Sequence, residues 1–182
     1  LSEQKIHEAQ LAELKPFCQQ IHVFQISAFS KYINTAFQLF TDRPFQVGYF
    51  YNYLIKQKIK KIIQHTKPDH IYCQLIRVAA YVKDYHHCPK TIDYMDALSL
   101  VMMRRAEKST GLMKRLLTIE GQRLEQYERK IFDYFENHSI ITTQDKNAIQ
   151  HANKAAIKVI PNGVSPKFFE PIKAEKKYDI VF

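Results

Sequence analysis

The sequence predicts an α/β domain that is built on a doubly wound, mostly parallel sheet. Short runs of apolar side chains alternate along the chain with longer segments in which apolar residues recur at helical spacing. The two strand-like runs at 70–73 and 91–94 are separated by a stretch long enough for a parallel crossover. The length of 182 residues fits one domain with a sizeable core.

The predicted strands are short runs in which apolar side chains alternate with polar ones or stand together. The third run, which contains Ile92, leads directly into two carboxylates. The fifth is followed by Pro161, Asn162 and Gly163, which break the pattern. In chain order the predicted strands are residues 21–26, 70–73, 91–94, 139–142, 156–160 and 178–182.

The predicted helices are amphipathic segments with recognisable ends. Ser2 caps the first helix and Pro16 stops it, and Ser27 or Ser30 caps the second. The third carries isoleucines at i, i+4, i+7 and i+8, starting from Ile55. In chain order the predicted helices are residues 2–15, 27–40, 53–65, 75–85, 97–103, 112–135 and 144–153, with a loop at 41–51.

The chain is basic, with a net charge of +9 and a pI near 9.4. Such a charge admits a nucleic acid, an anionic membrane or a phosphorylated ligand as a partner. The lysines are spread over several helices without a nucleic-acid-binding module, so no nucleic acid is expected. Lys56, Lys60 and Lys61 share a predicted helix, where a solvated face is favoured over recruitment to an anionic membrane.

The residue types and their spacing argue against several kinds of site. Four scattered glycines cannot form a glycine-rich phosphate loop. Three cysteines, an odd number without paired spacing, argue against a disulfide framework and fit a reducing compartment. A metal site could be drawn from nearby ligands, but no paired spacing anchors it and no metal is expected. These ligands are His70, Cys73, His86, His87 and Cys88.

Two carboxylates lie at the end of the predicted strand at 91–94, where an α/β protein opens its crevice. Asp93 and Asp96 are three residues apart, and a helix cap explains only one of them. Glu120 falls inside the apolar stripe of the long helix, where a buried carboxylate needs a cation or hydrogen bonds. Its candidate partners are Arg77, Arg104, Arg105 and Arg123.

An ordered set of motifs resembles the bacterial glycosyltransferases of family 4. Within that family, the set is most similar to the sugar transferases associated with exopolysaccharide and exosortase systems. The resemblance covers essentially the whole chain. The motifs are residues 74–77, 92–99 with Arg104 and Arg105, 120–124, 127–128, 140–145 and 159–164, and Phe168.

The resemblance implies a GT-B architecture of two Rossmann-like lobes. Residues 1–160 would be the N-terminal, acceptor-side lobe, 161–177 the linker between lobes, and 178–182 the first strand of the second lobe. A further strand with a glycine turn would precede Leu1. The second lobe would hold most of the nucleotide-sugar site, so we expect the N-terminal lobe to be inactive by itself.

The resemblance also implies roles for individual residues. Asp96 would be catalytic, by orienting the acceptor hydroxyl or accepting its proton. Asn162 and Gly163 would form the hinge for lobe closure. Met95 stands where many relatives carry histidine, so a histidine role is not carried over. The expected substrate-binding residues are Asp93, Ser99, Arg77, Arg104 and Arg105. For Asp93 a structural role, which holds the geometry of the loop or of an arginine, is favoured. Arg104 or Arg105 could instead clamp Glu120.

The expected reaction transfers a sugar, with retention favoured, from a nucleotide-sugar to a saccharide or a lipid-linked saccharide. No cofactor is expected beyond the donor substrate. The expected location is the cytoplasm. A peripheral contact with the inner face of the cell membrane stays an open alternative. The alternative interpretation is a non-catalytic α/β binding or scaffold domain that uses its basic surface.

Overall fold

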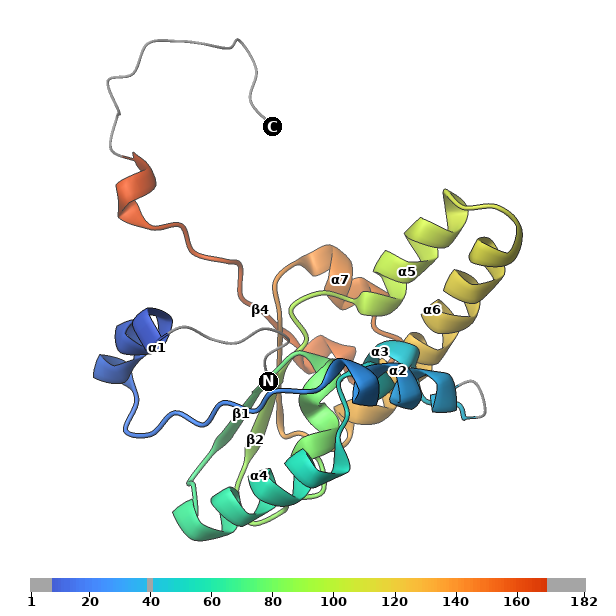
Figure 1. Ribbon diagram of the computed structural model, residues 1–182. Helices are drawn as coiled ribbons and strands as arrows, with labels where there is room; N and C mark the ends of the chain where they lie inside the picture. Colours follow the sequence, from blue (N-terminus) through green and yellow to red (C-terminus); the bar gives the residue numbers. More distant parts are fainter. Residues whose placement is uncertain (1–7, 39–40, 170–182) are drawn as a thin grey trace, which may run out of the picture.

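The computed structural model describes residues 8–38 and 41–169, and within them a four-stranded parallel sheet organises the α/β fold (Figure 1). The strands are β1 (Ile71–Gln74), β2 (Lys90–Asp93), β3 (Asn137–Ile140) and β4 (Lys158–Val159), in that spatial order. The register pairs Asp93 with Gln74 of β1 and with Ser139 of β3. Asp93 therefore ends a central strand at the carboxyl edge of the sheet.

Seven α-helices and several 3₁₀ turns connect the described part of the chain. Asn52 caps α4 by accepting a hydrogen bond from the amide of Ile55 at 3.1 Å, and Lys67 ends the helix in the left-handed region. The α-helices are α1 (Glu8–Leu14), α2 (Ala28–Phe37), α3 (Phe45–Tyr49), α4 (Tyr53–Thr66), α5 (Leu98–Glu107), α6 (Gly111–Phe132) and α7 (Thr143–Ala148). The 3₁₀ helices are η1 (Lys15–Phe17), η3 (Ile76–Tyr81), η4 (Lys154–Ala156) and η5 (Pro166–Phe169).

Helices α5 and α6 form an antiparallel hairpin that runs away from the sheet to a turn at its tip (Figure 1). Gly111 begins α6 at a φ of 59°, a conformation that L side chains rarely adopt. Near the base, a Cβ added at Gly121 would lie 2.7 Å from the Sδ of Met103, so glycine lets the two helices approach closely.

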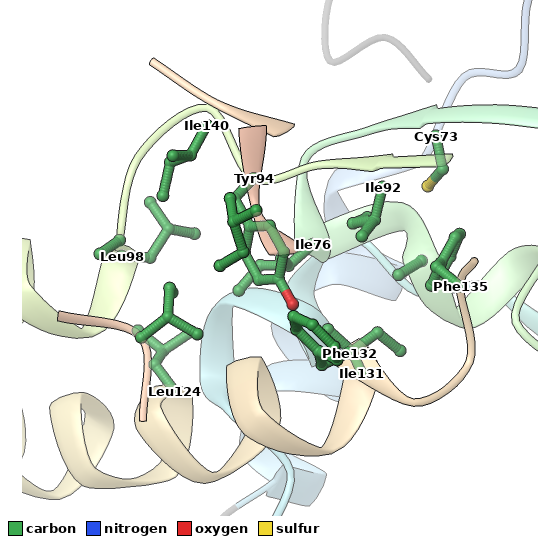
Figure 2. Packing of buried hydrophobic residues seen from close by; sticks show 14 of the residues in the cluster. Cys73, Ile76, Ile92, Tyr94, Leu98, Leu124, Ile131, Phe132, Phe135 and Ile140 are labelled. Atoms are coloured by element: carbon green, nitrogen blue, oxygen red, sulfur yellow. The ribbon is translucent and has the colours of Figure 1, made fainter. Parts of the chain in front are cut away.

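The main core lies between the sheet and α6 (Figure 2). Tyr94 is fully buried at its centre, and its hydroxyl donates a hydrogen bond of 3.2 Å to the carbonyl of Glu128. Leu124 and Ile131 of α6 pack toward Ile92 and Tyr94 in the same cluster. The apolar stripe of the long helix thus faces the sheet over the C-terminal part of the helix, as the sequence pattern predicts, whereas Met113 of the same stripe is exposed.

Three predicted elements differ in type from the elements that the structure shows. Residues 21–26 form no strand, only an isolated bridge at Gln25, because Ile26 packs on Ile55 and Tyr81 instead of joining the sheet. The predicted loop at 41–51 contains the short helix α3. The predicted helix at 75–85 is the tighter η3, which starts after Leu75 at a φ of 72°.

The other predicted elements are confirmed with shifted ends. The helix at 144–153 stops at Ala148, and the strand at 139–142 begins two residues earlier. The predicted strand at 178–182 and the start of the helix at 2–15 lie outside the described residues. No helix in the described ranges is both long and apolar enough to cross a bilayer.

Candidate functional site

Asp93 is nearly buried at the end of β2, and both of its carboxylate oxygens accept hydrogen bonds. Tyr72 of β1 donates its hydroxyl to Oδ2 at 2.6 Å, and the amide of Met95 donates to Oδ1 at 3.1 Å. The hydrogen bond to Asp93, followed by burial, raises the pKa of the Tyr72 hydroxyl. Asp93 therefore fixes the start of the turn that follows β2, as the loop-holding hypothesis for this residue predicts.

The turn after β2 is a strained three-residue γ-turn. The amide of Asp96 donates to the carbonyl of Tyr94 at 2.8 Å, and Met95 between them has a φ of 62°. A γ-turn with a positive central φ is rare, and such backbone strain concentrates at functional sites. The carbonyl of Met95 also accepts a hydrogen bond from the amide of Ile141 at 3.1 Å, which ties the turn to the end of β3.

Asp96 is exposed at the carboxyl edge, directly after this turn. Its neighbour Ala97 donates an amide hydrogen bond of 3.3 Å to Oδ1 of Asp145, which belongs to α7. Asp145 forms a capping pair with Thr142, since its amide donates to the threonine hydroxyl at 3.0 Å and its Oδ2 accepts from that hydroxyl. The structure thus holds Asp96 from both sides and leaves its carboxylate toward solvent.

Sequence reasoning assigned no role to Asp145, although the residue lies in a motif of the resemblance. The available signal was the spacing of Thr142 and Asp145 directly after a strand, which is typical of a capping pair. What the spacing could not show is that Asp145 also reaches Ala97, 48 residues earlier in the chain.

The paired arginines lie away from these carboxylates. Arg104 and Arg105 are exposed in the last turn of α5, about 10 Å along the helix axis from Ala97. Arg77 lies on η3 with its guanidinium 5.4 Å from the centre of the Phe50 ring. Within the described residues, the structure therefore does not gather Arg104 and Arg105 with Asp96.

Ser99 is buried, and its polar atoms are bound to Glu128. Its hydroxyl donates to Oε2 of Glu128 at 2.5 Å, and its amide donates to Oε1 at 3.0 Å. Glu128 is fully buried on α6, and burial raises its pKa to about 7 against the opposing hydrogen bonds. The expected substrate-binding residue Ser99 thus ties α5 to α6 in this structure.

Glu120 is satisfied by backbone amides, not by an arginine of the crevice. Its Oε2 accepts from the amide of Phe45 at 2.8 Å, and its Oε1 accepts from the amide of Gln46 at 3.0 Å. Burial raises the pKa of Glu120, and these two hydrogen bonds and the nearby charge of Arg123 oppose the shift. The expectation that Arg77, Arg104 or Arg105 clamps Glu120 is therefore wrong, because the carboxylate caps α3 instead.

The expected hinge residues lie in the irregular segment between β4 and η5. Asn162 and Gly163 are exposed, and a Cβ added at Gly163 would meet no atom within 4 Å. Their role in lobe closure stays a prediction, since residues 170–182 lie outside the described chain.

His86, His87 and Cys88 of the 84–89 loop line a hollow of about 760 Å³ near α4, together with Asp69. This hollow is at the amino edge of the sheet, opposite Asp93 and Asp96. In the described ranges, no three histidine, cysteine, aspartate or glutamate side chains are gathered as a metal ion would need.

Comparison with protein-family models, with curated proteins and with solved structures finds no match to this chain. These comparisons therefore assign the chain to no family.

Proposed function

We propose that this chain is the N-terminal, acceptor-side lobe of a GT-B glycosyltransferase, which transfers a sugar from a nucleotide-sugar to an acceptor hydroxyl. The observation that carries the proposal is the exposed carboxylate of Asp96, presented by a strained turn at the carboxyl edge of a parallel sheet. Ligands of open α/β sheets bind outside this edge. Rigid elements on both sides hold Asp96, which is what a positioned catalytic group needs.

In the proposed reaction, a new bond forms between the acceptor oxygen and the anomeric carbon while the bond from that carbon to phosphate breaks. The nucleoside diphosphate leaves with the electron pair of that bond. Asp96 orients the acceptor hydroxyl or accepts its proton. Asp93 and Asp145 are positioning residues, since each holds backbone on one side of Asp96. Retention is favoured by the resemblance alone.

The remaining parts of the proposal concern the whole protein. Residues 161–177 would link two Rossmann-like lobes, with Asn162 and Gly163 as the hinge. The donor and its leaving group would lie mainly on the second lobe. A cytoplasmic location is supported by the cysteines, because Cys18, Cys73 and Cys88 are all free thiols.

The natural full-length protein tests the proposal. Nucleotide-sugars are screened for sugar transfer or donor hydrolysis, first with the wild type and then with Asp96→Ala. The matched control is Asp69→Ala, because Asp69 is also exposed but lies at the opposite edge of the sheet. We expect turnover by the wild type and the control, and its loss in Asp96→Ala. Unchanged turnover in Asp96→Ala would contradict the catalytic role of Asp96. The absence of turnover with every donor would contradict the proposal that the protein is a glycosyltransferase.

A further inference from the structure

Several large apolar side chains are exposed on the first two turns of α6, at the tip of the hairpin. Leu112 is 72% exposed and Met113 is 57% exposed. Leu116 and Ile119 are also exposed, and their spacing from Leu112, i+4 and i+7, places the three on one side of the helix. Farther along α6, apolar residues such as Leu124 are buried against the sheet.

The position of the tip explains why these side chains stay uncovered. The hairpin carries them away from the sheet (Figure 1), and the residues of α6 that take part in the core begin with the partly buried Leu117. A cluster of exposed apolar side chains on one element marks an interaction surface more often than chance exposure. The tip of the hairpin therefore needs a partner that accepts apolar side chains.

The charges around the tip show the chemistry of that partner. From 103 to 119 the sequence holds five cations and one acid, Glu107. All five cations are exposed, and none of them forms an ion pair with another of the described residues. The cations are Arg104, Arg105, Lys108, Lys114 and Arg115. Apolar side chains surrounded by unpaired cations match an anionic interface, and a second copy of the tip would bring like charges together.

We propose that the tip of the α5–α6 hairpin docks on an anionic lipid bilayer. Leu112 and Met113 enter the boundary between head groups and acyl chains, and the five cations contact the lipid phosphates. The exposed turns from Leu112 to Ile119 span about 10 Å, similar to the depth that amphipathic helices reach at this boundary. This inference does not rest on the proposed transfer reaction.

The lysines of α4 are a weaker candidate for the same contact. Lys56 is paired with Asp84 at 2.9 Å, which fits the solvated face that the sequence favours. Leu54 on the same helix is 69% exposed, but among the residues of α4 only the adjacent Tyr53 is another exposed large apolar side chain. This helix therefore supplies matched controls for the hairpin.

The test is co-sedimentation of the natural full-length protein with vesicles. We expect binding to phosphatidylcholine vesicles that contain phosphatidylglycerol, weak binding to pure phosphatidylcholine, and release from the anionic vesicles at high salt. The double variant Leu112→Asp, Met113→Asp lowers the affinity by at least about tenfold, because a carboxylate does not enter the acyl boundary. Both side chains are exposed, so the variant keeps its fold.

A charge variant tests the contribution of the cations around the tip. The double variant Arg104→Glu, Arg105→Glu weakens binding to the anionic vesicles. The double variant Lys60→Glu, Lys61→Glu on α4 makes the same change in charge but retains most of the binding. The apolar control Leu54→Asp also leaves binding intact. Equal binding by the Leu112→Asp, Met113→Asp variant, or an equal loss in the α4 controls, would overturn the proposal. A dimer in solution that the same hairpin variant dissolves would overturn it in favour of a second copy.

Discussion

The hydroxyl of Ser99 donates a hydrogen bond of 2.5 Å to Glu128, and the amide of Ser99 donates a second one of 3.0 Å to the same carboxylate. This buried contact joins the first turn of α5 to the C-terminal part of α6. It lies on the core side of the segment that presents Asp96, so the structure that supports the candidate site contains a carboxyl group with a raised pKa of about 7.

The raised pKa of Glu128 predicts a stability that falls as pH rises. Burial favours the protonated form in the folded state, so this contribution is fully present below the ordinary pKa of 4.5 and is lost as pH rises through about 7. Over that window we expect the free energy of unfolding to fall by up to about 3 kcal/mol. Glu128→Gln removes this dependence, as urea unfolding at several pH values measures.

The quantity to compare is the pH dependence of the free energy of unfolding in the wild type and in Glu128→Gln, because other groups also titrate. Burial lowers the pKa of His138, which changes stability with pH in the opposite direction. Glu107→Gln, at an exposed position of α5, is the matched control and keeps the slope of the wild type. If the free energy of unfolding of Glu128→Gln changed with pH as steeply as that of the wild type, Glu128 would not be the source of the pH dependence.

Glu120→Ala is expected to lower the free energy of unfolding by about 1–3 kcal/mol, because the amides of Phe45 and Gln46 lose their acceptor. Hydrogen exchange at these two amides accelerates in the variant. Glu125→Ala, an exposed change on the same helix, stays within about 0.5 kcal/mol of the wild type. Unchanged exchange at Phe45 and Gln46 would show that Glu120 does not cap α3.

Gly48→Ala is expected to destabilise the contact between α2 and α3. The added Cβ would lie 2.3 Å from the Cγ of Gln38, a buried side chain whose amide donates to the carbonyl of Asn34 at 2.8 Å. We expect a loss of about 1–3 kcal/mol in the free energy of unfolding. The control Gly163→Ala, which meets no neighbouring atom, stays near the wild type. Adding Gln38→Ala to Gly48→Ala recovers part of the loss if the overlap is its cause.

Met95→Gly is expected to be tolerated better than Met95→Val. Glycine adopts the φ of 62° without a steric penalty, whereas a β-branched side chain there is strained. We expect the valine variant to be less stable by about 1–2 kcal/mol in chemical unfolding. Equal stability of the two variants would mean that the γ-turn is not strained.

The regular elements could be predicted from local patterns. The helix expected at 53–65 is α4 at Tyr53–Thr66, since its isoleucine spacing and its Asn52 cap are both local. Helix α3 was missed because its cap, Glu120, is 75 residues away from Phe45. The alternation at 21–26 was misread as a strand because Ile26 packs on α4 and η3.

The two aspartates of the candidate site could also be predicted from local patterns. Asp93 and Asp96 follow an apolar strand, and the end of a parallel strand places them at one edge. The arginine pair was expected beside them, but α5 carries Arg104 and Arg105 about 10 Å along its axis. The support from Asp145 depends on a contact between distant parts of the chain, which spacing alone does not show.

The most direct test of the account is the steady-state kinetics of Asp96→Asn in the natural full-length protein. At saturating donor and acceptor we predict a kcat about 100-fold or more below that of the wild type, because the amide cannot accept the acceptor proton. The donor KM should be nearly unchanged, since most donor contacts are expected on the second lobe. Asp69→Asn should leave both constants as in the wild type. A kcat for Asp96→Asn equal to that of the wild type would contradict the central claim that Asp96 acts on the acceptor.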